Sequence, residues 1–160
     1  MNYNSILVVS GEPNSIFLEI FFKSLRLKKI KSPIILISSE KLIKLQMKKL
    51  NFKKKIRKLK IEDLHSYKLD NKSINLININ YNPKIAFSKI SSKSNNFIKK
   101  SFDTAFKILL KRKIYKFING PISKKSFLKN KYLGITEYIS KNFSIRKTCM
   151  LIYNKNISVC

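Results

Sequence analysis

Two short loops in this sequence carry residue types that ligand-binding loops commonly use. Only 3 glycines occur among the 160 residues, and two of them lie in these loops. Glycine permits a positive φ and a close approach of the backbone to a ligand, so its retention in a glycine-poor chain indicates that the backbone needs this freedom. We predict that both loops border an active site. Their residues are Gly11, Glu12 and Pro13 in the first loop and Gly120 and Pro121 in the second.

Several side chains near these loops allow both a chemical and a structural interpretation. Lys124, three residues after Pro121, could offer an ammonium group to a phosphate at a helix start, or could be one of many solvated lysines. Thr136 could contact a substrate or cap a helix. Glu12 could orient a base or pair with a lysine, and the sequence leaves this choice open. His65, the only histidine, is interpreted as a surface residue.

The sequence contains no spacing of residues that predicts a metal site. Its two cysteines, Cys149 and Cys160, form neither a disulfide framework nor a paired zinc motif. Cys149 lies in an apolar run and is interpreted as a small core residue. The first apolar run, Ile6 to Val9, is too short for a signal segment or a membrane span, and no other run is long enough. We predict a soluble cytoplasmic protein with no membrane partner.

The charge of the chain is strongly positive, with 35 basic and 8 acidic residues and a net charge of +27. Such an excess could indicate a nucleic-acid partner. However, 31 of the basic residues are lysines and only 4 are arginines, the residue that makes bidentate contacts to phosphates and guanines. The densest cluster, Lys53 to Lys58, has no interleaved aromatic residues to stack bases. We favour compositional bias and no specific nucleic-acid partner, and keep a small basic nucleic-acid-binding protein as an alternative function.

An alternation of predicted strands and helices must position the two loops. Apolar β-branched runs are typical of strands covered on both faces, and apolar residues at every third or fourth position are typical of helices. Their order predicts a single α/β region over residues 1–160, with a mostly parallel sheet and flanking helices. In such sheets ligands bind beyond the carboxyl ends of the strands, where both loops lie. The predicted strands are 5–10, 33–38, 73–79 and 115–119, and the predicted helices follow Ser15 and Ser39 and span 95–113, 124–129 and 136–141.

The sequence also leads to predictions for the end of the chain and for the first helix. Residues 148–153 and 157–160 are predicted to form a hairpin, and the sequence stops inside this apolar pattern. Because termini usually lie at the surface, we expect the 160 residues to be the N-terminal part of a longer chain. The first helix is expected to carry Ile16, Ile20, Phe21 and Leu27 on its apolar face.

Four segments, in order, resemble the 4-hydroxythreonine-4-phosphate dehydrogenases of the PdxA family. Residues 6–16 are similar to the opening Thr-x-Gly-Glu-Pro-x-Gly-Ile segment, and residues 119–124 to a Thr-Gly-Pro-(Val/Ile)-x-Lys loop. Residues 133–138 are similar to a Gly-His-Thr-Glu-(Phe/Tyr) segment, and residues 148–154 to the Met-Met-Leu strand that follows. The match covers roughly the N-terminal half of that family's chain.

The resemblance implies a function as well as a fold. The fold would be one lobe of a two-lobed structure like those of isocitrate and isopropylmalate dehydrogenases, in a homodimer. The activity would be NAD-dependent oxidation and decarboxylation of 4-phosphohydroxy-L-threonine, a phosphorylated amino acid, on the route to pyridoxine 5′-phosphate (vitamin B6). A divalent metal (Zn, Mg or Co) would act as a Lewis acid. A PdxA-like dehydrogenase with a different substrate is a second alternative.

The resemblance also implies individual site residues. The family's substrate-contacting His-Thr pair falls on Ile135 and Thr136, and the lysine of its Gly-Pro loop falls on Lys124. Isoleucine cannot hydrogen-bond a substrate, and this departure motivates the alternative substrate. The metal-binding histidines of the family would lie beyond Cys160, so no metal ligand is predicted within the 160 residues. The catalytic residues are left unassigned, and the chain alone is predicted to be inactive.

Overall fold

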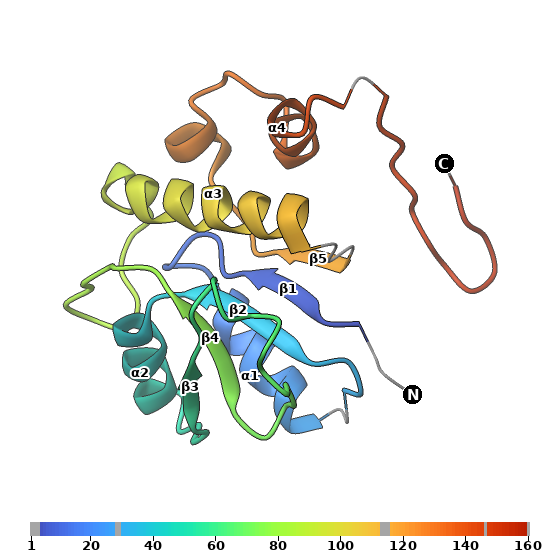
Figure 1. The fold of residues 1–160 in the computed structure, drawn as a ribbon. Coiled ribbons are helices and arrows are strands. Elements are labelled where there is room, and N and C mark those ends of the chain that lie inside the picture. Colours follow the sequence, from blue (N-terminus) through green and yellow to red (C-terminus); the bar gives the residue numbers. More distant parts are fainter. Residues whose placement is uncertain (1–3, 28–29, 113–115, 146, 160) are drawn as a thin grey trace.

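A five-stranded parallel sheet forms the centre of the structure (Figure 1). The computed structural model describes residues 4–27, 30–112, 116–145 and 147–159. The strands lie in the order β3-β4-β2-β1-β5, and every neighbouring pair is parallel. This arrangement confirms the predicted parallel α/β sheet. The strands are β1 (Ile6–Val9), β2 (Ile34–Ser38), β3 (Ile56–Lys58), β4 (Ile74–Asn78) and β5 (Lys116–Asn119).

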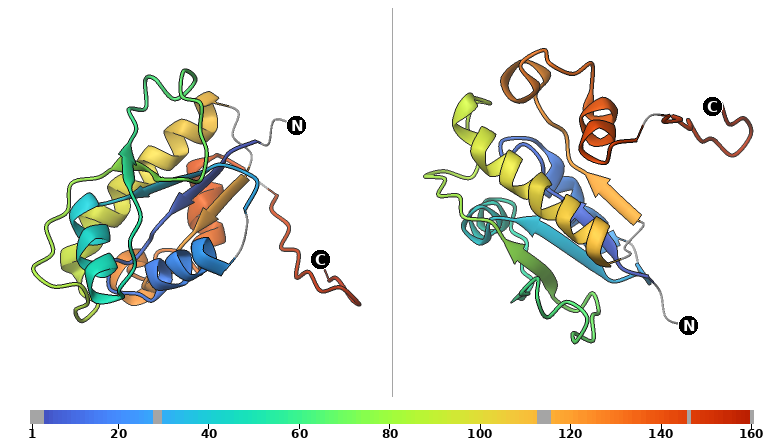
Figure 2. Two further views of the ribbon diagram at one scale, coloured as in Figure 1. Left: turned by 90° about the horizontal axis from the view of Figure 1, so that it is seen from below. Right: turned by 45° about the horizontal axis from the view of Figure 1, so that its top comes forward.

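Helices cover both faces of the sheet (Figures 1 and 2). From β1 through β2 to β3 the chain moves across the sheet toward the β3 edge. From β4 to β5 it moves back across the sheet to the opposite edge. Because such crossovers are right-handed, α1 (Phe17–Leu27) and α2 (Glu40–Lys49) lie on one face and α3 (Asn95–Arg112) lies on the other. In the part of the chain that the structure describes, no helix has the length and apolar character of a membrane span. The remaining helical elements are η1 (Ser92–Ser94), η2 (Lys124–Leu128) and α4 (Ile135–Asn142).

The core lies between these layers and is rich in aromatic rings. The central strand β2 is buried along its whole length, as its unbroken apolar run predicts. On the α3 face, Phe102 contacts Tyr138 at 5.6 Å between ring centroids, and Phe106 contacts Phe143 at 5.1 Å. These edge-on contacts join α4 and the residue after it to α3 rather than to the sheet, so α4 forms an outer layer.

The apolar face of α1 differs from the prediction. The helix carries two overlapping apolar stripes, and the structure buries the one that includes Phe22, whose ring stacks on Phe52 at 4.8 Å. Phe21 belongs to both stripes, and the buried stripe adds Phe22, whose large ring is removed from water by stacking on Phe52. The buried residues are Leu18, Phe21 and Phe22, whereas Ile16, Ile20 and Leu27 are 65%, 50% and 75% exposed.

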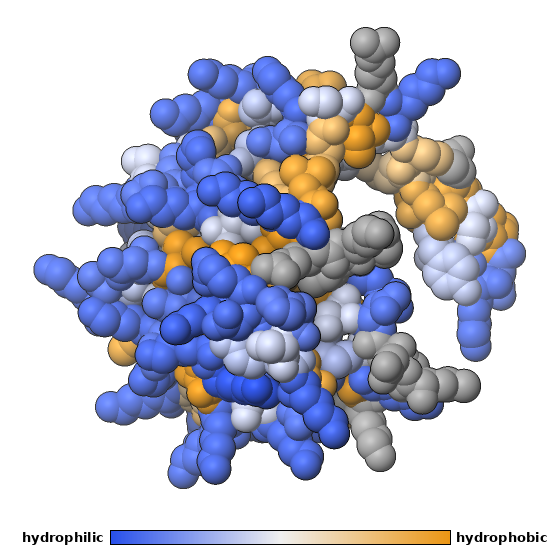
Figure 3. Space-filling model, in the orientation of Figure 1, coloured by the Kyte–Doolittle hydropathy of each residue, from blue (hydrophilic) through white to orange (hydrophobic). Residues whose placement is uncertain are grey.

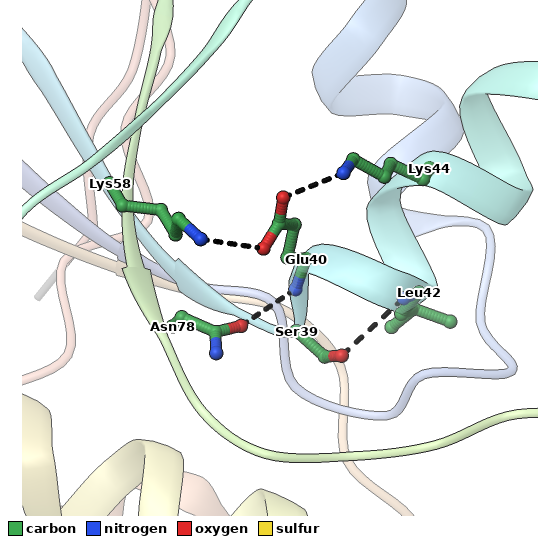
Figure 4. Close-up of polar contacts among 6 residues, drawn as sticks. All are labelled: Ser39, Glu40, Leu42, Lys44, Lys58 and Asn78. Atoms are coloured by element: carbon green, nitrogen blue, oxygen red, sulfur yellow. Dashed lines mark hydrogen bonds and ion pairs between the residues drawn. The ribbon is translucent and has the colours of Figure 1, made fainter.

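The start of α2 is fixed by polar contacts (Figure 4). Ser39 is the N-cap, and its hydroxyl accepts a hydrogen bond from the Leu42 amide. The Glu40 amide donates to Asn78 Oδ1 at 2.8 Å, which joins the helix to the end of β4. The Glu40 carboxylate pairs with Lys44 at 2.7 Å and with Lys58 at 3.3 Å. These contacts satisfy groups that a helix N-terminus leaves unbonded.

Glu40 therefore provides a test of pH dependence. Hydrogen bonds from Lys44 and Lys58 lower the pKa of Glu40 below its usual value of 4.5. A carboxylate with a lowered pKa in the folded state stabilises the fold above its unfolded-state pKa, and this contribution is lost as the pH falls through the folded-state pKa. We expect Glu40→Gln to lower the free energy of unfolding at neutral pH by less than about 1 kcal/mol, because the pair is solvent-exposed. Urea denaturation should show the two proteins converging at acidic pH, and a difference that persists there would contradict the prediction.

The C-terminal segment turns back on itself as the predicted hairpin does, but it pairs through an isolated bridge and not through two full strands. Ile152 and Val159 form this antiparallel bridge and exchange two backbone hydrogen bonds, at 2.8 and 3.0 Å. The segment leads away from the helices, and its hydrophobic residues are exposed at the right of the molecule (Figures 1 and 3). Cys149 is exposed and disulfide-bonded, so its interpretation as a core residue is wrong. The apolar pattern is present, but no described element supplies a surface that would bury it.

Candidate functional site

The two glycine loops meet at the carboxyl edge of the sheet. Strands β1 and β5 are neighbours in register, with Val9 opposite Asn119, so the loops that follow them emerge side by side. The Glu12 amide donates to the Pro121 carbonyl oxygen at 2.8 Å. Gly11 has a φ of +68°, and a Cβ there would lie 2.5 Å from that same oxygen. The structure thus brings the predicted loop residues together, and their role in binding stays a prediction.

Gly11 and Gly120 allow the two loops to pack closely against each other. This packing determines whether the β1–α1 turn could bind the pyrophosphate of a dinucleotide. A dinucleotide-binding turn after the first strand uses glycine so that a pyrophosphate can approach its backbone. Here the space over Gly11 holds the Pro121 carbonyl, and a Cβ on Gly120 would overlap the Ser10 carbonyl oxygen. The β1–α1 turn is therefore filled by protein and does not form a pyrophosphate cradle.

Glu12 is a buried carboxylate at the centre of this edge. It is 2% exposed, and none of the ion pairs within the described residues includes it. Its Oε1 accepts hydrogen bonds from the backbone and side-chain amides of Asn14, both at 3.2 Å, and its Oε2 accepts one from Ser94 Oγ at 3.0 Å. Buried charges are tolerated when hydrogen bonds satisfy them. Of the two interpretations left open, pairing with a lysine is wrong.

A chain of hydrogen bonds continues from Glu12 toward the second loop. Ser94 precedes Asn95, the first residue of α3, whose Nδ2 donates to the Ser126 carbonyl at 2.8 Å. The Ser126 amide in turn donates to Ser123 Oγ, the N-cap of η2. These contacts tie the position of η2, and with it the backbone of Lys124, to the buried carboxylate.

A cavity of about 610 Å³ opens beside these loops. Asn14, Tyr81 and the loop between β4 and α3 line it, and its lysines are Lys84, Lys89 and Lys93. None of the described residues that line it is acidic, so its potential favours an anion. Burial first, and then the negative charge of Glu12, raise the pKa of the Tyr81 phenol, which keeps that group neutral. We call this hollow the carboxyl-edge cavity.

Gln46 joins the two loops that contribute residues to the carboxyl-edge cavity. Its Nε2 donates to the Pro13 carbonyl at 2.8 Å and to the Ala86 carbonyl at 2.9 Å, and the residue is fully buried. One α2 side chain therefore holds the β1–α1 loop and the β4–α3 loop together. Sequence reasoning missed this cavity. The available signal was residues 79–94, which follow a strand and contain three lysines and no acid.

The remaining predicted substrate residues begin two later helical elements. Lys124 is exposed and starts η2, which agrees with a lysine at a helix start. Ile135 starts α4 and packs against the core, and Thr136 follows it. Gly134 is the N-cap of α4, so the interpretation of Thr136 as the cap is wrong. Within the described residues, no hydrogen bond joins Thr136 to the glycine loops.

The described residues do not provide a metal site. Among residues 4–27, 30–112, 116–145 and 147–159, no group of three or more His, Cys, Asp or Glu side chains could hold a metal ion. His65 lies exposed in a turn between β3 and β4. The run Lys53–Lys55 and three further lysines line an open hollow. Phe52 is the one aromatic residue among the described residues that line this hollow, and it is buried. That hollow therefore offers positive charge without an exposed ring for stacking bases.

Comparisons with known proteins show a family and a fold. The sequence profile of the family described as Pyridoxal phosphate biosynthetic protein PdxA matches residues 29–160. A 4-hydroxythreonine-4-phosphate dehydrogenase from Burkholderia phymatum is 18% identical with a TM-score of 0.83, covering 98% of this chain and 48% of that chain. The enzyme of that name from Klebsiella pneumoniae is 16% identical with a TM-score of 0.81, covering 97% and 49%. The chain thus spans about half the length of these structures. No curated protein matches it.

Proposed function

Because the profile match over residues 29–160 shows that this chain belongs to the PdxA family, we propose that it forms the N-terminal lobe of a 4-hydroxythreonine-4-phosphate dehydrogenase. The family match is the observation that carries the proposal, and the shared fold supports it. The proposed reaction is NAD-dependent oxidation of the hydroxyl of 4-phosphohydroxy-L-threonine, followed by decarboxylation. Its product would serve pyridoxine 5′-phosphate synthesis. We further propose a cytoplasmic homodimer of longer, two-lobed chains.

The described residues fit only part of this chemistry. They supply no metal-ligand set and no pyrophosphate cradle, so in this proposal NAD and the divalent metal are held by other segments of the complete protein. What this lobe supplies is a rigid carboxyl edge, built on the contact between the glycine loops and on the Glu12 hydrogen bonds. The substrate would be bound against this edge.

The charge of the edge suits a phosphorylated substrate. The carboxyl-edge cavity presents three lysines, and Lys124 adds a further exposed ammonium group at the start of η2. Lysine binds phosphate as a point charge and needs no fixed geometry, so exposed lysines can receive the phosphate from several directions. Thr136 and Ile135 would contact the amino-acid portion. Attraction by this edge raises the local concentration of an anionic substrate.

The proposal is tested by assaying the complete gene product with NAD, a divalent metal and the phosphorylated substrate. We expect NADH formation by that product and none by the 160-residue chain alone. The double variant Lys84→Ala/Lys89→Ala should raise KM by about tenfold with little change in kcat, because it removes ground-state attraction to the phosphate. The charge-matched control Lys53→Ala/Lys54→Ala should leave KM unchanged. A complete product without turnover would overturn the proposed function, and equal effects of the two variants would overturn the role of the cavity.

The second candidate function is a related enzyme with a different substrate, and Ile135 is the residue that supports it. An isoleucine half-buried against the core cannot donate a hydrogen bond where the family pattern has histidine. If the histidine is the missing element, Ile135→His in the complete product should raise turnover of the phosphorylated hydroxythreonine. An unchanged rate would remove the reason for proposing another substrate.

A further inference from the structure

A second cavity lies apart from the carboxyl-edge loops, between the first turns of α3 and the segment that joins η2 to α4. Its volume is about 390 Å³, within the range of small-molecule sites. Three aromatic side chains form its walls, and three lysines stand at its rim. We call it the aromatic cavity. The aromatic residues are Phe127, Tyr132 and Tyr138, and the lysines are Lys99, Lys129 and Lys131.

The aromatic walls are held in fixed orientations by one another. Tyr138 meets Phe127 edge-on at 5.5 Å between centroids and Tyr132 edge-on at 5.4 Å. The Lys141 ammonium group lies 5.6 Å from the centroid of Tyr132, over its ring. Aromatic rings fixed in this way provide flat apolar surface on which a planar ligand ring can stack without ordering the protein further.

Tyr138 also brings a phenol group to the lining of this cavity. The residue as a whole is 9% exposed. Burial, together with the nearby Asp103 and Tyr132, raises the pKa of this phenol to about 12, so it remains an O–H donor at neutral pH. A ligand in the cavity that presents an oxygen or a ring nitrogen could accept a hydrogen bond from it.

The rim of the cavity is positive. Lys129 and Lys131 are exposed, and neither takes part in an ion pair with the described residues. Lys99 pairs with Asp103 at 2.7 Å, and the described residues that line the cavity include no carboxylate. Two free ammonium groups beside an apolar aromatic wall match a ligand whose one end is a flat ring and whose other end is a phosphate.

We propose that the aromatic cavity binds a small planar aromatic ring that carries a phosphate group, through ring stacking, the Tyr138 hydroxyl and the ammonium groups of Lys129 and Lys131. The proposal does not depend on the dehydrogenase function, because it uses none of the carboxyl-edge residues. Such a ligand could be a phosphorylated pyridine compound or a nucleotide. Both classes combine a planar aromatic ring with a phosphate group, which are the two features that the cavity would recognise.

Isothermal titration calorimetry of the 160-residue chain with pyridoxine 5′-phosphate, at physiological salt and without NAD or metal, tests the proposal. This probe has no aldehyde and so forms no imine with lysines. We expect one saturable site per chain. Tyr138→Phe keeps the ring packing and should weaken binding by about fivefold to tenfold, the value of one hydrogen bond. Lys129→Ala/Lys131→Ala should weaken it by about tenfold or more.

The controls separate a built site from general attraction to a lysine-rich surface. The charge-matched variant Lys53→Ala/Lys54→Ala should bind as the parent chain does. Pyridoxine, which lacks the phosphate, and methyl phosphate, which lacks the ring, should each bind at least about tenfold more weakly. Tighter binding of adenosine 5′-monophosphate would support the proposal and identify nucleotides as the source. The absence of a saturable site, or equal losses in both double-lysine variants, would overturn it, whatever the outcome of the dehydrogenase assay.

Discussion

Gly120→Ala is expected to lower the free energy of unfolding by about 3 kcal/mol. A Cβ at this position would overlap the Ser10 carbonyl oxygen and lie 2.7 Å from the carbonyl carbon and 2.9 Å from Phe17 Cγ. Two of these atoms belong to backbone at the end of β1, so they cannot move away without breaking the contact between the glycine loops. Urea denaturation followed by circular dichroism measures the loss.

Gly134→Ala is the matched control for this substitution. Gly134 has extended backbone, and a Cβ there would meet only Glu137 Oε2, at 3.1 Å, which is the end of a flexible side chain. The same chemical change should therefore cost less than about 1 kcal/mol, most of it from the weaker N-cap. Similar losses at both positions would show that crowding against the β1 backbone is not the reason for Gly120.

The strands and helices of this protein were predictable because their signals are local. β2 is an unbroken apolar run, and α3 repeats apolar residues at helical spacing over five turns of chain. Ser39 was identified as preceding a helix, and its hydroxyl caps α2. Each of these features depends on residues within one element, and a single sequence contains them.

Features that depend on contacts between distant elements were not predictable in the same way. The α1 sequence contains two apolar stripes, and the buried one is the stripe whose Phe22 stacks on Phe52, a residue of a distant segment. The glycine loops were identified individually, but their contact follows from the pairing of β1 with β5, more than 100 residues apart in sequence. The carboxyl-edge cavity was missed because three lysines carry little information in a chain with 31.

Glu12→Ala should lower the free energy of unfolding by about 2 to 3 kcal/mol, whereas Glu12→Gln should cost less than about 1 kcal/mol. Alanine leaves the two Asn14 N–H groups without their acceptor and creates a hole between the β1–α1 loop and α3. Glutamine keeps the volume and one carbonyl oxygen, which can face Asn14. Urea denaturation of both variants at neutral pH measures the difference.

The tolerance of glutamine rests on the second contact of the carboxylate. Ser94 Oγ lies 3.0 Å from both Glu12 Oε2 and the Ser91 carbonyl, so its single proton can turn to Ser91 and its lone pairs can accept from the new amide. Glutamine also removes the cost of burying an unpaired charge. Equal destabilisation by alanine and glutamine would mean that the negative charge at the start of α3 stabilises the edge. A smaller loss with glutamine would mean that hydrogen bonds hold the β1–α1 loop to Ser94 at the start of α3. The rigid carboxyl edge proposed for substrate binding would then depend on acceptor geometry and not on charge.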